Sequence, residues 1–286
     1  MSARAFVTPV VACLLPAICQ AAQPAIQHHA SPTILSEFQN AKPGTDVRLI
    51  VSFKIDPTWH LYWDGQNDTG QPPQFTWKLP KGWIISPPQF PVPHRNVQPG
   101  DIVDYIYETS LSLGFTLSIP KDAAAKTEPI SASIEWLECS DRCMFGAGDV
   151  KTNILVLDSS QSATAKPNPE AQKALEVLDS QIPKPWSAAK GVVMEIGENA
   201  AIFTAKSADK LEFFPGKACS TPKNALAGTS AKGPTLSVEF LTEKSPPIVD
   251  GILAVYRTKG GPPDYYRLSE NPSLPKATEP TAPPIK

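Results

Sequence analysis

The sequence predicts an all-β protein, and three observations lead to that prediction. Proline accounts for 32 of the 286 residues, about twice its usual ~5% share, and it disrupts helix interiors because it lacks a backbone donor. Apolar and polar residues alternate over 45–55, 110–119 and 130–136, the period-two pattern of strands with one buried face. Shorter strands separated by Pro and Gly turns are expected at 59–63, 75–79, 83–86, 102–107 and 150–157. Eight short strands at near-regular spacing indicate a β-sandwich.

A second, smaller β-rich lobe is expected after one connecting helix. The sandwich is placed at 33–158 and is followed by a Ser-, Thr-, Ala- and Pro-rich linker at 159–168. The helix is expected over 169–182, because Pro169 suits a first turn and apolar residues then share one face. The lobe is placed at 169–270, with strands at 192–196, 200–206, 211–214, 235–241, 252–257 and 265–268. The Pro-rich end at 271–286 is predicted to be disordered.

The first 22 residues have the pattern of an export signal. Arg4 precedes an apolar stretch, and small residues suitable for cleavage stand at its end. The stretch is too short and too proline-broken to span a membrane, so we expect a soluble, periplasmic, monomeric mature protein. Residues 23–32, which contain His28 and His29, are expected to form a disordered polar tail. The net charge of −2 and the absence of a basic stripe argue against nucleic-acid partners.

Three cysteines remain after the expected signal: Cys139, Cys143 and Cys219. The first two flank the turn-forming triplet Ser-Asp-Arg, so a hairpin would bring their Cα atoms ~4.5–5.5 Å apart, close enough for a disulfide. Three uses of the pair are open: reversible thiol–disulfide exchange, an inert staple, or half of a metal site. A staple over about five residues contributes only ~2 kcal/mol, which favours the redox use. Cys219 is either a buried inert thiol or the donor of an intermolecular disulfide.

A set of motifs in a fixed order resembles a known family. These motifs are Trp59-His60-Leu61-Tyr62-Trp63, Asp68-Thr69-Gly70-Gln71-Pro72-Pro73, Trp77-Lys78-Leu79-Pro80-Lys81-Gly82-Trp83, Pro91-Val92-Pro93-His94-Arg95, Tyr105-Ile106-Tyr107-Glu108 and Trp136-Leu137-Glu138-Cys139-Ser140-Asp141-Arg142-Cys143. They are similar to the N-terminal periplasmic domain of DsbD-type thiol:disulfide interchange proteins, in particular the ScsB-like branch that is linked to copper tolerance. The resemblance covers roughly residues 33–157, and the second lobe resembles the same branch more weakly.

This resemblance implies an immunoglobulin-like sandwich that acts as an electron carrier of the thiol–disulfide oxidoreductase type. It implies that reducing equivalents pass from a membrane-embedded thiol reductase, here on a separate chain, through the cysteine pair to thioredoxin-like or disulfide-containing periplasmic proteins. Cys143 would form the mixed disulfide with a partner, and Cys139 would resolve it. In DsbD a loop with an aromatic tip covers the cysteines, whereas the equivalent stretch 94–101 has no aromatic residue.

Four further residues are predicted as neighbours of the cysteine pair. Arg142 should favour a thiolate at Cys143, Glu138 should disfavour one at Cys139, and Tyr105 and Tyr107 are candidates for contact. The aromatic residues Trp59, Tyr62, Trp63, Trp77 and Trp83 are assigned to the core, with framing of the redox site as the alternative. His60 and His94 are interpreted as ordinary hydrogen-bonded histidines, with proton transfer or copper binding as the alternative.

No metal site and no cofactor are predicted. Two rival functions stay open beside thiol–disulfide exchange. One is a non-catalytic β-sandwich binding module whose disulfide is structural. The other is a Cu(I)-handling protein that uses the two thiolates as soft ligands.

Overall fold

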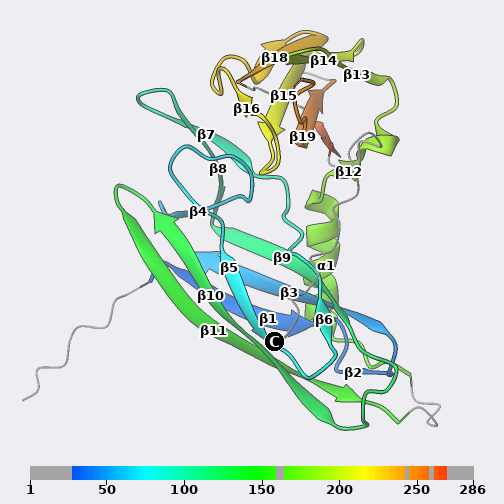
Figure 1. The fold of residues 1–286 in the computed structure, drawn as a ribbon. Helices are drawn as coiled ribbons and strands as arrows, with labels where there is room; N and C mark the ends of the chain where they lie inside the picture. The colour runs from blue at the N-terminus through cyan, green and yellow to red at the C-terminus, as the bar shows by residue number, and fades with distance from the viewer. Residues whose placement is uncertain (1–27, 159–163, 242–244, 258–260, 269–286) are drawn as a thin grey trace, which may run out of the picture.

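The all-β fold predicted from the sequence is confirmed, with one α-helix in the part of the chain that is described (Figure 1). The computed structural model describes residues 28–158, 164–241, 245–257 and 261–268. The expected export signal, the expected C-terminal tail and residues 159–163 of the expected linker lie outside these residues. No helix among the described residues has the length and apolar character needed to cross a membrane.

Two antiparallel sheets form the larger part of the molecule. The first has the order β1-β3-β9-β6 and contains β1 (Ala30–Ser36), β3 (Asp46–Ile55), β9 (Ser110–Ser118) and β6 (Ile84–Ile85). The second has the order β2-β11-β10-β4-β8-β7 and contains β2 (Asn40–Ala41), β11 (Cys143–Val156), β10 (Thr127–Cys139), β4 (His60–Tyr62), β8 (Ile102–Glu108) and β7 (His94–Gln98). A further strand, β5 (Gln74–Lys78), pairs with β10 along the edge opposite β11. The short β2 pairs in parallel with the end of β11.

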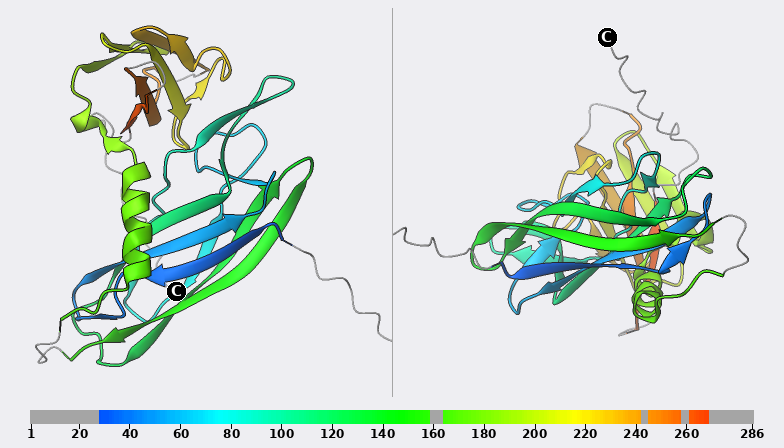
Figure 2. Two further views of the ribbon diagram at one scale, coloured as in Figure 1. Left: turned by 180° about the vertical axis from the view of Figure 1, so that it is seen from behind. Right: turned by 90° about the horizontal axis from the view of Figure 1, so that it is seen from below.

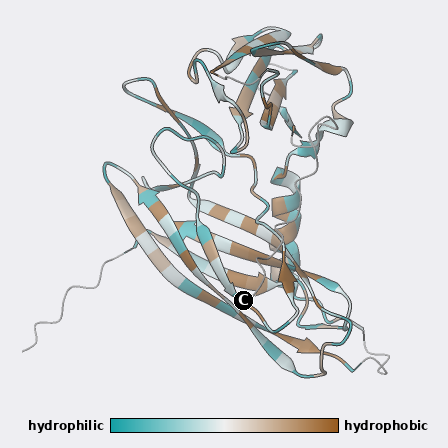
Figure 3. Cartoon of the chain, in the orientation of Figure 1, coloured by the Kyte–Doolittle hydropathy of each residue, from teal (hydrophilic) through white to brown (hydrophobic). Residues whose placement is uncertain are grey.

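The core between the sheets is built from the alternating residues seen in the sequence. Leu49, Val51 and Phe53 of β3 are fully buried, and apolar and polar positions alternate along the long strands (Figure 3). The tryptophans Trp63 and Trp83 are buried, and Trp59 and Trp77 pack against the same cluster. The predicted assignment to the core is therefore confirmed for these four tryptophans. It is wrong for Tyr62, which packs in a separate cluster with Cys139. Burying this apolar surface, at about 25 cal/mol per Å², is the main stabilising contribution to the sandwich.

The structure corrects the sequence prediction at the start of the sandwich. Residues 28–32 were expected in a disordered tail, but β1 begins at Ala30 and pairs along its whole length with β3. The rest of that expected tail, 23–27, lies outside the described residues. Strand β7 was also not predicted, and it forms the edge of the second sheet.

Helix α1 (Pro169–Gln181) lies against the outer face of the first sheet (Figure 2). Asn168 caps the first turn, and Pro169 lies in that turn, as the sequence predicts. Leu175 and Leu178 pack on Ile50 of β3, so the apolar stripe of the helix covers a residue that faces away from the sandwich core.

The second lobe follows the helix and has its own core. One sheet has the order β12-β20-β19-β15-β17, and its strands are β12 (Lys184–Pro185), β20 (Asp264–Arg267), β19 (Gly251–Tyr256), β15 (Lys210–Pro215) and β17 (Ser230–Lys232). The other has the order β13-β14-β18-β16, and its strands are β13 (Val192–Ile196), β14 (Ala200–Ala205), β18 (Thr235–Leu241) and β16 (Thr221–Pro222). Strands β13 and β14 pair as an antiparallel hairpin at the turn expected from the sequence.

The lobe and the sandwich are joined by direct contacts. Phe214 of β15 packs into the sandwich core, with its ring 5.2 Å from that of Tyr105. The Arg95 guanidinium of β7 donates hydrogen bonds to the carbonyls of Ala225 and Leu226, at 3.1 and 2.6 Å. The second lobe therefore contacts both strands of the edge hairpin β7–β8, through Arg95 of β7 and Tyr105 of β8.

Candidate redox site

The cysteine pair closes the hairpin between β10 and β11. Cys139 and Cys143 are register partners, joined by a disulfide with a Cα–Cα distance of 4.1 Å. Residues 140–142 form the turn, in which the Ser140 N–H donates to the Arg142 carbonyl at 3.0 Å. The predicted three-residue turn is therefore present. The two strands pair continuously for thirteen residue pairs from Thr127↔Leu155 to Cys139↔Cys143, so the turn is held in place without help from the sulfur–sulfur bond.

The two cysteines differ sharply in exposure. Cys139 is 1% exposed, whereas Cys143 is exposed at the start of β11. Phe145, two residues further along β11, is 85% exposed. A large exposed aromatic side chain beside an accessible sulfur is a typical feature of protein contact surfaces.

Neighbouring residues of β10 point to opposite faces of the sheet. Trp136 belongs to the core between the two sheets, whereas Cys139 packs in a small cluster on the other face with Tyr62, Ile106 and Leu137. Glu138, between Leu137 and Cys139, is on the same side as Trp136, and its carboxylate accepts a hydrogen bond from the Trp136 indole at 2.9 Å.

The Glu138 carboxylate is fully buried and anchors the start of β1. It accepts hydrogen bonds from the backbone N–H groups of His29 and Ala30, at 3.0 and 2.8 Å, and its Oε1 lies 3.5 Å from Nδ1 of His28. The sequence prediction placed this charge beside the Cys139 sulfur. In the structure the carboxylate lies on the opposite face of the sheet from the Cys139 side chain. Cys139 and Cys143 therefore differ in their burial rather than in their distance from this charge.

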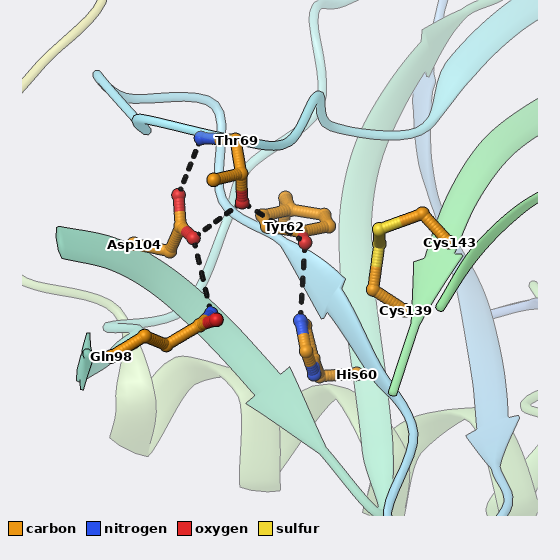
Figure 4. The surroundings of a disulfide bond; sticks show 7 residues. All are labelled: His60, Tyr62, Thr69, Gln98, Asp104, Cys139 and Cys143. Atoms are coloured by element: carbon orange, nitrogen blue, oxygen red, sulfur yellow. Dashed lines mark hydrogen bonds between the residues drawn. A yellow bond between two sulfur atoms is a disulfide. The ribbon is translucent and has the colours of Figure 1, made fainter. Parts of the chain in front are cut away.

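The face that holds Cys139 carries a histidine and a tyrosine from the neighbouring strand β4. His60 is the register partner of Cys139, and Tyr62 lies two residues further on the same face. The His60 Nε2 and the Tyr62 hydroxyl are 3.1 Å apart. In Figure 4 the Tyr62 ring lies between Thr69 and the disulfide. Burial lowers the pKa of the His60 imidazole, an effect opposed by the negative charges of Asp104 and Glu108.

A loop covers this tyrosine and continues the polar contacts. The Tyr62 hydroxyl lies 3.4 Å from the Thr69 hydroxyl, which donates to the carboxylate of Asp104 at 2.6 Å. The Thr69 N–H donates to the other oxygen of Asp104 at 3.0 Å, and Gln98 contacts that carboxylate at 3.5 Å. A Cβ atom at Gly70 would overlap the Tyr62 ring, so the loop approaches the ring as closely as only glycine allows.

Side chains of the same loop bind the backbone of β8. Asn67 Oδ1 accepts a hydrogen bond from the Tyr105 N–H, and Asp68 accepts one from the Val103 N–H, both at 2.7 Å. These side-chain bonds take the place of the β4–β8 backbone hydrogen bonds beyond the end of β4. Asn and Asp side chains readily form such bonds to nearby backbone groups. The loop therefore has a fixed position above Tyr62.

The structure does not place the predicted tyrosines at the disulfide. Tyr105 and Tyr107 face the core between the sheets, and burial raises the pKa of Tyr105 to about 12. The Tyr107 hydroxyl donates to the Pro91 carbonyl at 2.7 Å. Ile106 between them is the residue that meets Cys139. Of the predicted neighbours, Arg142 alone lies beside the pair on the exposed turn.

Trp136 and Gly146 form a close cross-strand pair below the site. They are register partners in β10 and β11, and a Cβ atom on Gly146 would overlap the Trp136 indole. Glycine at position 146 therefore leaves room for the Trp136 indole, whose N–H donates a hydrogen bond to Glu138.

The remaining sequence candidates lie away from the disulfide. Cys219 is buried as a free thiol, and burial raises its pKa to about 12, which keeps it protonated at neutral pH. Its carbonyl accepts a hydrogen bond from Gln66 across the contact between lobe and sandwich. His94 is exposed on β7. Within the described residues, no group of three or more His, Cys, Asp or Glu side chains is placed to hold a metal ion.

The sandwich thus ends in a hairpin with one buried and one solvent-facing cysteine joined by a disulfide, an arrangement chemically suited to thiol–disulfide exchange. Residues 31–154 match the family model of the thiol:disulfide interchange protein DsbD, N-terminal. The resemblance seen in the sequence is therefore confirmed over these residues. A comparison with curated protein sequences found no match.

Two solved structures are similar to this chain. The N-terminal periplasmic domain of ScsB from Proteus mirabilis is 12% identical with a TM-score of 0.55, and the match covers 86% of this chain and 95% of that chain. At this identity the match shows a shared fold, which includes the second lobe. The N-terminal domain of Neisseria meningitidis DsbD in the reduced form is 14% identical with a TM-score of 0.27, over 44% of this chain and 86% of that chain.

Proposed function

We propose that the protein exchanges disulfides through Cys139 and Cys143, with Cys143 as the sulfur that meets partner proteins and Cys139 as the resolving sulfur. The observation that carries the proposal is the difference in exposure, 1% for Cys139 against an exposed Cys143. Exchange proceeds by attack of a thiolate on a disulfide sulfur through a mixed disulfide. A partner can reach only the exposed sulfur, and the buried one is held next to it for the second step.

The position of the pair in the hairpin supports a reversible bond. The β10–β11 ladder continues to the cysteines themselves, and the bond closes a loop with a sequence separation of only four. In the chain-entropy account such a short loop contributes about 2 kcal/mol, against about 4.7 kcal/mol for a loop of ~100 residues. Opening the bond therefore costs the fold little.

The partners follow from the family of the sandwich domain. We propose that reducing equivalents come from a membrane-embedded thiol reductase on a separate chain and pass to thioredoxin-like or disulfide-containing proteins. The Proteus mirabilis ScsB domain is described as periplasmic, and the periplasm is the compartment proposed here. The exposed Phe145 beside Cys143 offers an apolar contact for either partner.

Trapping tests the assignment of the two sulfurs. Cys139→Ser and Cys143→Ser are made in a Cys219→Ser background, so that only one thiol remains in each protein. Cells are acid-quenched, and mixed disulfides are separated on non-reducing gels and identified by mass spectrometry. We expect Cys139→Ser to accumulate a mixed disulfide through Cys143, and Cys143→Ser to accumulate little. The reverse pattern would exchange the two roles, and no adduct with either variant would argue against disulfide exchange.

A redox titration separates exchange from a structural disulfide. The purified protein is equilibrated in dithiothreitol buffers of graded potential, and the thiol state is read by alkylation. An exchange site is expected to have a potential above the about −300 mV typical of structural disulfides. A potential below that value, together with failure of the trap, would support the binding-module alternative.

A further inference from the structure

The buried sulfur of Cys139 lies beside polar groups that the exchange proposal does not yet use. His60 is directly across from Cys139 in the β10–β4 pair, where Cβ atoms are about 4.5–5.5 Å apart. Tyr62 packs against Cys139 in the same small cluster. Both side chains are almost inaccessible to solvent, at 8% for His60 and 1% for Tyr62. They are therefore polar side chains beside Cys139 where water has little access.

The hydrogen count allows the hydroxyl of Tyr62 to donate to His60. The Thr69 hydroxyl has a single hydrogen, and it is donated to Asp104 at 2.6 Å. The Tyr62 hydrogen is then available for Nε2 of His60, which at 3.1 Å is closer than the Thr69 oxygen at 3.4 Å. In this arrangement His60 is neutral, its unprotonated Nε2 accepts the hydrogen bond from Tyr62, and the Tyr62 oxygen keeps lone pairs to accept a proton.

We propose that Tyr62 and His60 form a proton relay for Cys139, in which the tyrosine hydroxyl passes the thiol proton to Nε2 of the histidine. This inference rests on the exchange function proposed above. It names Tyr62, which contacts Cys139, as a catalytic residue, and His60 as the proton acceptor behind it. Thr69 and Asp104 are positioning residues that fix the tyrosine hydroxyl.

The relay acts in the second step of exchange. In the first step the Cys143 thiolate attacks a partner disulfide, a Cys143–partner bond forms, and one partner thiolate leaves. In the second step the Cys139 thiol gives its proton to the Tyr62 oxygen while the Tyr62 hydrogen moves to Nε2 of His60. The Cys139 sulfur then attacks the Cys143 sulfur, the Cys139–Cys143 bond forms, and the second partner thiolate leaves. The partner gains two electrons, the cysteine pair loses two, and the proton remains on His60 until water removes it.

The pKa shifts of Tyr62 and His60 agree with a tyrosine that passes a proton on and a histidine that accepts it. Burial raises the pKa of Tyr62, so the tyrosine passes a proton on rather than holding a negative charge. Burial also lowers the pKa of His60, which keeps the imidazole neutral and ready to accept. The charged groups that face it are Asp104 and Glu108 of β8, and they stabilise the imidazolium once it has formed. Running the sequence backwards, the imidazolium returns a proton to the leaving Cys139 thiolate when the disulfide is reduced.

The test separates the two steps with dithiobis-nitrobenzoate as the probe disulfide. Each molecule of the reduced protein releases two coloured thiolates, the first when Cys143 attacks and the second when Cys139 resolves. The probe thiolate is a good leaving group, so the second release is limited by loss of the Cys139 proton. The variants are Tyr62→Phe, which removes only the hydroxyl, and His60→Gln. All are made in the Cys219→Ser background, so that no third thiol contributes.

Two matched controls exclude a merely structural effect. Tyr107→Phe removes a buried tyrosine hydroxyl that bonds to Pro91 on the inner face, and His94→Gln removes an exposed histidine of β7. Both controls should release the two thiolates at the rates of the unmodified protein.

We expect the second release to slow at least about tenfold in Tyr62→Phe and in His60→Gln, within the about 10²–10⁴-fold range of general acid–base catalysis. The first release should change by less than about twofold. In both variants the second rate should rise about tenfold per pH unit below the thiol pKa, because it then follows the thiolate fraction alone. The unmodified protein should show a shallower dependence.

Unchanged second-step rates and pH profiles in both variants would overturn the relay and leave the exchange function standing. A reduced protein that does not release the second thiolate at all, even without substitution, would instead overturn the exchange function. If Tyr62→Phe fails to fold, His60→Gln and its pH profile decide the question.

Discussion

The backbone N–H of Ala30 donates a 2.8 Å hydrogen bond to the carboxylate of Glu138, a residue 108 positions later that adjoins the buried cysteine. This hydrogen bond therefore links the start of β1 to the end of β10, the strand that carries Cys139. Cys139 lies on the outer face of the second sheet, whereas Glu138 lies on the face toward the core between the sheets.

Glu138→Ala should lower the free energy of unfolding by about 2 kcal/mol or more. The substitution leaves the amides of His29 and Ala30 and the Trp136 indole N–H without an acceptor in the protein, and each buried unsatisfied donor costs about 1–3 kcal/mol. Urea unfolding followed by tryptophan fluorescence measures the change. Glu135→Ala, at an exposed position of the same strand, is the control and should stay within about 0.5 kcal/mol. Equal effects of the two substitutions would show that the anchor contributes nothing.

Reduction of the disulfide should leave the fold intact. Closing so short a loop contributes about 2 kcal/mol, and about 1 kcal/mol shifts the melting temperature of a protein of about 150–250 residues by ~2–4 °C. We expect the reduced protein to melt less than about 10 °C below the oxidised protein, with the same far-ultraviolet circular dichroism before melting. A larger drop would identify the bond as a structural staple. The Cys139→Ser, Cys143→Ser double variant should melt like the reduced protein.

Limited alkylation should modify Cys143 before Cys139. In the reduced protein Cys143 stays exposed on the turn, whereas Cys139 is covered by Tyr62 and Ile106. Iodoacetamide at neutral pH, with the sites counted by mass spectrometry, should label Cys143 first and Cys219 last, because burial raises the Cys219 pKa to about 12. The unfolded protein in guanidinium chloride should lose this order. Earlier labelling of Cys139 would contradict the proposed roles.

The ion pair between Arg48 and Asp179 should make a small, pH-dependent contribution to stability. Arg48 of β3 donates two hydrogen bonds to the Asp179 carboxylate of α1, and the bond from Arg48 lowers the pKa of Asp179. A depressed native pKa gives stability that is present above the unfolded pKa and is lost as the pH falls through the native one. Both groups are partly exposed, so Asp179→Asn should cost at most about 1 kcal/mol at pH 7.

The difference between Asp179→Asn and the unmodified protein should disappear in acid, as measured by urea unfolding at several pH values. Glu176→Gln, at an exposed position of the same helix, is the matched control. A cost for Asp179→Asn that persists at low pH would mean that the side chain acts through packing or helix propensity rather than through its charge.

The strands found from the sequence either alternate, like β3, or are buried on both faces, like β8 and β19. The strands missed lie at sheet edges. β3, β9 and β10 show clear alternation, because each packs on the core with one face only. The start of β1 was assigned to a polar tail, and β1 contains Pro32, which is tolerated because β1 is an edge strand. β7 has a single apolar residue, Val97, and its position depends on Arg95 and the second lobe rather than on a buried face of its own.

The cysteine turn could be predicted from local sequence, but its surroundings could not. Spacing alone identified the hairpin, because Cys139 and Cys143 are close along the chain. Whether Tyr105 or Ile106 faces Cys139 depends on the register of three strands that are distant in sequence. A shift of one residue exchanges the two faces. The signal for Tyr62 was present in the pattern His60-Leu61-Tyr62, where an apolar residue separates two polar ones, but only the pairing of β4 with β10 places it at the disulfide.

The close pair of Trp136 and Gly146 restricts how the sequence of this domain can diverge. A side chain at 146 would push the indole from its place, and with it the N–H that binds Glu138. Substitution at either position alone should therefore be selected against. Relatives that carry a larger residue at the position of Gly146 should also carry a smaller one at the position of Trp136, as a covarying pair separated by ten residues. Such a pair would reveal the hairpin register in an alignment even where the cysteines have been lost.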